Sequence, residues 1–142
     1  LKDYDYIIID SPPALGPMTI NALSASNSVL IPIQCEFFAL EGLAQLLNTV
    51  KLVRKSINPK LTIKGFIPTM YSSQNNLSKQ VFADLQQHFK DKLFKDEDDQ
   101  YIVVPRNVKL AESPSFGKPA ILYDVKSIGS ISYQNLAQAI MR

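Results

Sequence analysis

Apolar residues along this 142-residue chain fall into short uninterrupted runs, separated by longer stretches in which they recur every three or four positions. The runs are rich in β-branched residues and are punctuated by Pro, Gly or Asp, which is typical of strands buried on both faces of a sheet. The first run contains three consecutive isoleucines and closes on Asp10. We therefore predict strands at Tyr4–Asp10, Val29–Ile33, Leu61–Pro68 and Tyr101–Val104.

The stretches between these runs have the spacing of amphipathic helices. We predict helices over Ala39–Ile57, Leu77–Phe94 and Ser127–Met141, with Asn76 or Ser78 as the N-cap of the second. Their predicted apolar faces comprise Leu43, Leu46, Leu47, Val50 and Val53 in the first helix, Val81, Phe82, Leu85, Phe89 and Leu93 in the second, and Ile128, Ile131, Leu136 and Ile140 in the third.

The alternation of strand and helix predicts an α/β fold with a parallel sheet, because parallel neighbouring strands need long crossover connections. No internal repeat and no linker interrupts the pattern, so we expect one domain. The first residue is Leu1, and an apolar strand is predicted to begin almost at once. We therefore expect the chain to be a piece of a longer protein.

Composition excludes several classes of protein. Hydrophobic residues make up 46% and charged residues 20%, which excludes a disordered chain. The net charge of +2 excludes a histone-type DNA-binding protein, but it is unevenly spread, with −4 over residues 1–41 and +3 over residues 102–142. No apolar run is long enough to cross a bilayer, and the single cysteine, Cys35, cannot form an internal disulfide.

Asp10 is the first candidate for chemistry. It stands directly after an apolar strand, at the end where open α/β sheets bind their ligands. A carboxylate there suits a hydrated magnesium ion beside a nucleotide, which is the Walker B arrangement. A pattern of four apolar residues and an acid is equally consistent with an aspartate that only ends the strand and caps the next segment.

Longer segments resemble the ParA/Soj family of chromosome and plasmid partitioning ATPases. They are YDYIIIDSPPALG with TINAL, then VLIPIQCEFFALEGL, TMY with NLSKQV, and VPRNVKLAESPSFGKPAILYD. They occur in family order over nearly the whole chain and are more specific than a Walker B pattern alone. The resemblance implies that residues 1–142 are the C-terminal part of a ParA-type ATPase domain, with an incomplete P-loop NTPase-like fold of a mostly parallel sheet flanked by helices.

The family resemblance also implies a function. Such proteins use ATP and Mg²⁺, form a homodimer in the ATP state and bind double-stranded DNA without sequence preference. A partner of the ParB/Spo0J type stimulates hydrolysis and releases the DNA. The implied location is the cytoplasm, in association with the nucleoid and not with a membrane.

Individual residues inherit expectations from the same resemblance. Asp10 matches the Walker B acid, a catalytic residue that holds the magnesium ion through water. Lys109 matches a DNA-binding position, and Lys118 and Lys126 are further candidates because phosphate contacts need only a positive charge in the right place. The segment that lies against the adenine base is matched by Pro105, Arg106 and Asn107.

Two departures from the family pattern limit these expectations. Gln74 stands where family members commonly have an arginine and brings no charge, so this part of the implied DNA-binding surface is either missing or has moved. None of the five glycines belongs to a phosphate-binding loop, and Gly117-Lys118-Pro119 lacks the Ser or Thr that such a loop requires. We therefore expect the intact parent to hydrolyse ATP and the isolated 142-residue chain not to.

Two other functions stay open. One is a MinD-type cell-division ATPase, although the outer positions of the last helix, Gln134, Asn135 and Gln138, are not those of a basic membrane-binding helix. The other is a non-catalytic interaction module that lacks the nucleotide-binding half. We expect the acidic run Asp96–Asp99 to be a solvated loop, and we expect His88 and Cys35 to be structural residues.

Overall fold

The computed structural model describes residues 3–12 and 16–142. Its sheet consists of two parallel strands, β1 (Ser28–Gln34) and β2 (Thr62–Thr69). Their register runs from Ser28 opposite Thr62 to Gln34 opposite Thr69, with one shift between Val29 and Leu30. Both strands were predicted from sequence, and their parallel pairing confirms the α/β class.

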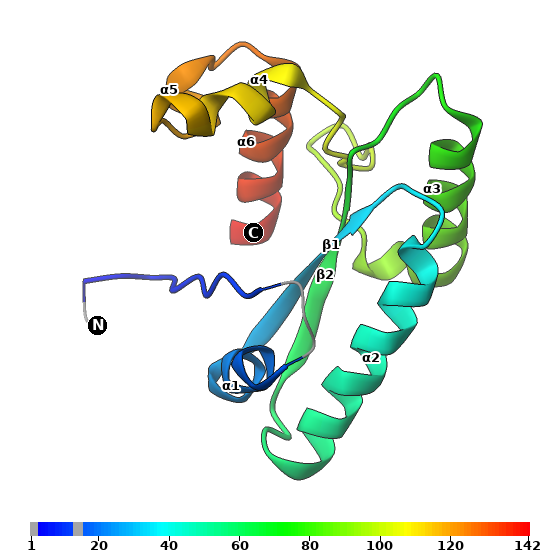
Figure 1. Cartoon of the computed structure of the whole chain (residues 1–142), viewed down its shortest axis with the longest axis vertical. Coiled ribbons are helices and arrows are strands. Elements are labelled where there is room, and N and C mark those ends of the chain that lie inside the picture. Colours follow the sequence, from blue (N-terminus) through cyan, green and yellow to red (C-terminus); the bar gives the residue numbers. More distant parts are fainter. Residues whose placement is uncertain (1–2, 13–15) are drawn as a thin grey trace.

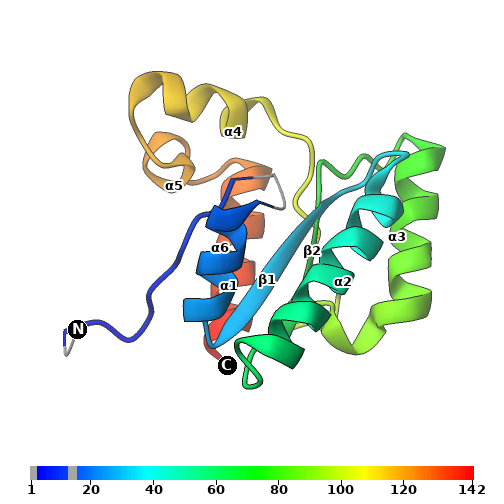
Figure 2. The same cartoon turned by 60° about the horizontal axis from the view of Figure 1, so that its bottom comes forward.

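Helices surround this pair of strands (Figure 1). In both Figure 1 and Figure 2, α2 and α3 lie on one side of the sheet, whereas α4, α5 and α6 form a group beyond its other side. In chain order the helices are α1 (Pro17–Ala25), α2 (Ala39–Ser56), α3 (Asn76–Phe89), the 3-10 turn η1 (Lys90–Lys92), α4 (Val108–Glu112), the 3-10 turn η2 (Ser113–Phe116), α5 (Ala120–Tyr123) and α6 (Ile128–Met141).

The main hydrophobic core lies between the sheet and helices α2 and α3. Phe66 of β2 is 1% exposed, and it packs with Ile31 and Ile33 of β1, Leu43 of α2 and Leu85 of α3. A second cluster joins Leu23, Val50, Val53 and Leu61, and so anchors α1 to the end of α2. The predicted apolar face of the first helix is therefore confirmed, and so is that of the second up to Phe89. The prediction that the second helix continues to Phe94 was wrong, because α3 ends at Phe89, and Leu93 reaches the core from the extended backbone after η1.

The N-terminus of α3 is capped by a residue that the sequence did not single out. The Asn75 side chain accepts hydrogen bonds from the backbone N–H groups of Leu77 at 2.9 Å and Ser78 at 3.4 Å. The prediction of Asn76 or Ser78 as N-cap was wrong by one to three positions, because the helix begins at Asn76. Ser78 is instead buried, and its hydroxyl accepts a hydrogen bond from the Ser72 N–H at 3.1 Å.

The strand predicted at Tyr4–Asp10 is wrong for this structure. These residues form neither helix nor strand, and Ile8 is 90% exposed (Figure 1). A strand exists only when a neighbour satisfies its backbone hydrogen bonds. Among the described residues, β1 and β2 pair with each other and no segment pairs with residues 4–10. The apolar run therefore has the composition of a buried strand without its partner.

The strand predicted at Tyr101–Val104 is also wrong as a regular strand. Single bridges join Lys95 to Tyr101 and Tyr71 to Pro105, and the N–H of Val104 donates to the Pro68 carbonyl at 2.8 Å. The segment is extended and follows the end of β2, but its pairing is interrupted. Sequence periodicity also did not reveal α1, α4 or α5.

Helix α6 confirms the predicted closing helix, but only part of its apolar face is covered. Leu136 is buried, whereas Ile128 is 60% and Ile131 44% exposed, so the prediction that these two pack inward was wrong. Ser127 caps the helix by accepting from the Ser130 N–H at 3.2 Å. Within the part of the chain that the structure describes, no helix is both apolar and long enough to span a bilayer.

Candidate functional site

The carboxyl ends of β1 and β2 meet the segment that carries Arg106. The N–H of Cys35 donates to the Thr69 carbonyl at 2.9 Å, which keeps the strands paired to their ends. The N–H of Tyr71 then donates to the Val104 carbonyl at 3.1 Å, and the Arg106 N–H donates to the Tyr71 carbonyl at 3.0 Å. Because open α/β sheets bind ligands outside the carboxyl ends of their strands, the structure brings this segment to the expected ligand-binding edge.

Met70 lies at the point where β2 ends and has a left-handed backbone with φ of 53°. A positive φ is uncommon for a residue other than glycine, and such strained positions concentrate at functional sites. Here the left-handed residue separates the last residue of β2, Thr69, from Tyr71, which pairs with the segment around Arg106. The strain therefore lies at the same edge of the sheet.

An ion pair joins Arg106 to the loop that follows β1. Nη2 of Arg106 donates to Oε1 of Glu36 at 2.7 Å. The Arg106 side chain is 62% exposed and the Glu36 side chain 54% exposed. An exposed pair of this kind contributes little to stability, so its main effect is to orient the guanidinium. Sequence analysis missed Glu36, because a contact between residues 70 positions apart leaves no local pattern.

Asn107 has a structural role in this segment. Its side-chain oxygen accepts a hydrogen bond from the Lys109 N–H at 2.9 Å and caps α4. Pro105 is half-buried and Arg106 is exposed. The predicted base-binding residues thus form the turn that leads from the sheet into α4, and their contact with adenine stays a prediction.

Lys109 is held by two neighbours. Its Nζ donates to Oε2 of Glu112 at 3.1 Å, and the Tyr123 hydroxyl donates to the same oxygen at 3.1 Å. The Lys109 nitrogen also lies 5.7 Å from the centre of the Tyr123 ring, which in turn stacks on Phe116. The predicted DNA-binding lysine is therefore partly neutralised. Neither Glu112 nor Tyr123 was a candidate from sequence, although the i,i+3 spacing of Lys109 and Glu112 on a helix signals such a pair.

These contacts shift all three titrating groups. The hydrogen bond and charge of Glu112 raise the pKa of Lys109. The hydrogen bonds from Lys109 and Tyr123 lower the pKa of Glu112. Desolvation and the bond to Glu112 raise the pKa of Tyr123. At neutral pH the cluster therefore consists of a cationic Lys109, an anionic Glu112 and a neutral tyrosine.

The other two predicted DNA-binding lysines flank α5. Lys118 precedes the helix and Lys126 follows it, and both side chains are exposed. Among the described residues neither forms an ion pair. The structure thus places all three lysines in the α4–α5 region that Figure 1 shows at one end of the molecule, while their contact with DNA stays a prediction.

Asp10 lies in the irregular N-terminal segment, and its side chain is exposed. No hydrogen bond or ion pair joins it to the base-binding segment or to any other described residue. The described residues also contain no group of acids, cysteines or histidines able to enclose a metal ion. The prolines at positions 12 and 13 are expected from sequence to fix the loop next to a magnesium site, but Pro13 lies outside the described residues. The structure therefore does not bring Asp10 together with Pro105–Asn107.

Cys35 and His88 have the structural environments that the sequence suggested. Cys35 is 3% exposed, and burial raises the pKa of its thiol to about 11 despite the opposing hydrogen bond with Ser78. His88 is exposed on α3, with its Nδ1 2.8 Å from the carbonyl oxygen of Asp84. Among residues 3–12 and 16–142, neither has a hydrogen-bond partner that would activate it as a nucleophile.

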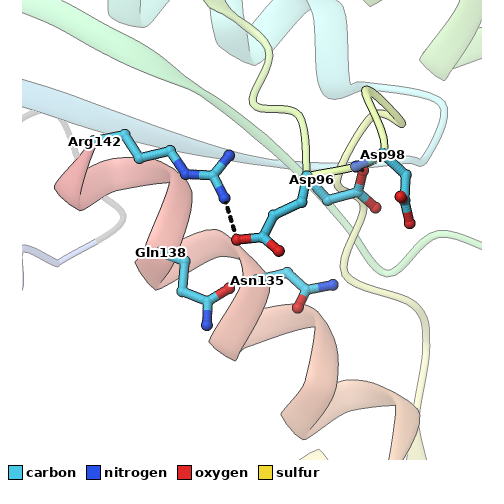
Figure 3. A pocket seen from close by; sticks show the side chains of 6 residues that line it. Asp96, Asp98, Asn135, Gln138 and Arg142 are labelled. Atoms are coloured by element: carbon cyan, nitrogen blue, oxygen red, sulfur yellow. Dashed lines mark hydrogen bonds and ion pairs between the residues drawn. The ribbon is translucent and has the colours of Figure 1, made fainter.

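The acidic run forms a turn that faces α6 (Figure 3). Asp96 closes the turn by accepting from the N–H groups of Asp98 and Gln100, at 3.0 and 2.9 Å. Arg142 Nη2 donates to Oε1 of Glu97 at 2.7 Å, across an open hollow of about 150 Å³. Glu97, Asp98 and Asp99 are exposed and Asp96 is half-buried, so the run forms a loop, as expected from sequence.

The architecture belongs to the P-loop NTPase-like α/β class. Cobyrinic acid a,c-diamide synthase from Mycobacterium smegmatis is similar with a TM-score of 0.73 and 32% identity, over 99% of this chain and 48% of that one. The Pyrococcus furiosus cell division ATPase MinD is similar with a TM-score of 0.72 at 20% identity, over 98% and 52%. The latter likeness concerns the fold alone.

Sequence comparison narrows the class. A family model described as an AAA domain matches residues 1–63. The sporulation initiation inhibitor protein Soj of Bacillus subtilis is 53% identical over 98% of this chain and 53% of its own length. The chromosome partitioning protein ParA of Myxococcus xanthus is 51% identical, over 99% and 47%. The chain is thus homologous to the ParA/Soj partitioning ATPases along nearly its whole length, and it spans about half the length of these relatives.

Proposed function

We propose that residues 1–142 form the C-terminal part of a ParA-type ATPase domain that acts in chromosome or plasmid partition. The observation that carries this proposal is the 53% identity to Soj over 98% of the chain. In the proposed cycle, an ATP-bound homodimer binds double-stranded DNA without sequence preference, and a ParB/Spo0J-type protein stimulates hydrolysis. The protein then acts in the cytoplasm, on the nucleoid.

We propose that two separate parts of the described chain contribute to a magnesium nucleotide site in the complete domain. The turn Pro105–Asn107 lies at the carboxyl edge of the sheet, with Arg106 oriented by Glu36, and we propose that it lies against the adenine. Asp10 has an exposed carboxylate without an ion pair among the described residues, which suits a contact to the hydration shell of Mg²⁺. The bound nucleotide would supply the phosphoanhydride bond whose hydrolysis drives the cycle.

The phosphates need a cradle that this chain does not contain. None of its five glycines belongs to a Gly-Lys-Ser/Thr loop. An ATPase assay on the 142-residue chain should therefore show no Mg²⁺-dependent turnover, whereas a protein extended upstream to the length of the relatives should hydrolyse ATP. Turnover by the 142-residue chain would contradict this assignment.

We propose that Lys109, Lys118 and Lys126 contact DNA phosphates. Their α4–α5 region carries Lys118 and Lys126 without ion pairs among the described residues. In the extended protein with ATP and Mg²⁺, replacing one phosphate-contacting lysine by Ala should lower the log–log salt slope of DNA binding by about one unit. The measurement is binding of a random-sequence duplex over a salt series. Unchanged slopes for all three variants would remove the assignment.

The same protein preparation separates the two alternative functions. Binding to anionic vesicles without binding to DNA would favour a MinD-type protein, whose fold is shared. An extended protein that dimerises or binds a ParB-type partner but neither binds nor hydrolyses ATP would favour a non-catalytic interaction module. DNA binding that requires ATP would support the partitioning function against both.

A further inference from the structure

The stretch between Glu41 and Asp84 contains six basic residues and no acidic residue. Four of these bases, Lys51, Arg54, Lys55 and Lys60, lie in the last turns of α2 and in the loop that leads to β2. All four are exposed, and none forms an ion pair among the described residues. We call these four residues the α2 basic surface.

Three of the four residues of the α2 basic surface share one face of the helix. Residues three and four positions apart are neighbours on a helix, so Lys51 lies beside both Arg54 and Lys55. Together with Pro59 these three residues border a shallow hollow of about 330 Å³. The Asn58 amide fixes the end of the helix by donating to the carbonyls of Leu23 at 3.0 Å and Ser26 at 2.8 Å.

Within the described chain, the elements that pack against this part of α2 do not compensate its charge. Helix α1 and strand β1, which contact α2, contain no charged residue. The acid of α2 itself, Glu41, lies in the first turn, at the other end of an 18-residue helix. The positive charge is therefore directed to solvent, where it is available to an anionic ligand.

Helix stability accounts for only part of this pattern. Cations in the last turn interact favourably with the helix dipole, which explains Arg54 and Lys55. It does not explain Lys51, which stands four positions before Lys55, a like-charge spacing that weakens a helix. Lys60 lies beyond the helix altogether.

We propose that the α2 basic surface is a second site for the phosphate backbone of double-stranded DNA. Repeated cations on an open surface suit a regular polyanion, and the Arg54 guanidinium can hold a phosphate through two hydrogen bonds. The nearby exposed apolar residues are Leu52 in α2 and Ile57, which follows the last residue of the helix. Five positions separate them, and cations outnumber them on this surface, which favours a polyanion over an apolar partner.

This site is separate from the lysines around α5. Figure 1 and Figure 2 both show α4 and α5 at the opposite end of the molecule from the C-terminal end of α2. The inference rests on the proposed function, because it takes DNA as the polyanion. It adds that one molecule engages DNA phosphates at two places, and that the two sets of contacts contribute independently to the salt dependence of binding.

The test compares two double variants of the extended protein, with ATP and Mg²⁺. Lys51→Ala/Lys55→Ala removes two cations of the α2 basic surface, and Lys79→Ala/Lys90→Ala removes two exposed cations from α3 and its end. The first variant should lower the salt slope for a random-sequence duplex by about 1.8, since each neutralised phosphate contributes about 0.9. The control should leave the slope unchanged, and neither variant should change ATP hydrolysis without DNA.

The outcomes distinguish this inference from the proposed function. If the parent binds DNA and Lys109→Ala lowers the slope while Lys51→Ala/Lys55→Ala does not, the second site is wrong and the function stands. If the parent does not bind DNA, the proposed function is wrong. Loss of binding to poly-L-glutamate or to anionic vesicles, with DNA binding intact, would assign the surface to an acidic protein or a membrane and overturn its assignment to DNA.

Discussion

Lys109 shows how a single contact changes the function inferred for a residue. Sequence resemblance marks it as a cation that contacts DNA, but in the structure Glu112 accepts its hydrogen bond at 3.1 Å and shares that oxygen with Tyr123. A phosphate and the Glu112 carboxylate therefore compete for the same ammonium group. Under the proposed function, Glu112 therefore weakens DNA binding. It competes with phosphate for Lys109 only while its carboxyl group is ionised.

Replacing Glu112 by Gln should strengthen non-specific DNA binding. The variant removes the charge that raises the pKa of Lys109, so that pKa should return toward its ordinary value while the lysine stays protonated at neutral pH. With one more free cation, the salt slope should increase by up to about 0.9. Asp91→Asn is the matched control, because it makes the same charge change at an exposed residue of η1. Equal gains in DNA binding by the two variants would show that the effect comes from net charge alone and not from release of Lys109.

Cys35 supplies a pH dependence of stability with a definite sign. Burial raises the pKa of its thiol from 9.0 to about 11 in the folded chain. Between these values the unfolded chain loses its thiol proton first, so it binds fewer protons than the folded chain and stability falls as pH rises. Urea unfolding at pH 9, 10 and 11 should therefore show a steeper loss for the parent than for Cys35→Ala. Parallel losses would contradict this role.

At the scale of whole elements, the glycine of β2 and the glycine of α2 differ in the space that surrounds them. A Cβ on Gly65 of β2 would lie 2.7 Å from the Lys92 carbonyl oxygen and 2.5 Å from the Phe94 ring, whereas a Cβ on Gly42 of α2 would meet nothing within 4 Å. Strand β2 can therefore lie against the segment after α3 only with glycine at this position.

Gly65→Ala and Gly42→Ala should thus change stability in opposite directions. The first should cost about 1 to 3 kcal/mol, because backbone and ring must move to admit the methyl group. The second should gain up to about 1 kcal/mol, because Ala is the better helix former. Urea unfolding of both variants measures the difference. A Gly65→Ala protein as stable as the parent would show that this close approach is not maintained in solution.

The elements predicted correctly from sequence are those in which the spacing of apolar residues follows directly from the local structure. Helices α2 and α3 bury an apolar stripe against the sheet, and the stripe is visible as a period in the sequence. The runs at 4–10 and 101–104 have the composition of strands, but strand formation depends on a partner that composition cannot reveal. Helices α4 and α5, of five and four residues, are too short for periodicity to register.

For the candidate site, sequence could propose residues but not their contacts. Resemblance identified the segment of Arg106 and Lys109, and the structure places it at the carboxyl edge of the sheet and in the adjoining helices. It could not identify Glu36, because only folding brings that residue to Arg106. It also could not show that Lys109 is paired, since a DNA-contacting lysine and an ion-paired one have the same sequence.

At the scale of the whole molecule, the N-terminal segment leaves a run of apolar side chains exposed to solvent. Tyr4, Tyr6 and Ile7 are 75%, 56% and 64% exposed, and Ile8 is 90% exposed, although the run is as apolar as a buried strand. Exposed apolar area of this size marks a surface that another part of a protein covers. The relatives are about twice as long as this chain, and we propose that an upstream part of the same domain covers the run.

Hydrogen exchange should reveal this cover. In the 142-residue chain the amides of residues 6–9 form no backbone hydrogen bonds with described residues, so they should exchange at nearly the rates of an unfolded peptide. In the protein extended upstream to the length of its relatives, these amides should become protected, because the segment then gains neighbouring strands. Ile31 of β1, which is buried in the core of the 142-residue chain, is the internal control. Equally fast exchange at residues 6–9 in both proteins, with Ile31 protected in each, would show that the run is not a strand of the complete domain, and Asp10 would then lose the buried strand that its role as a Walker B acid requires.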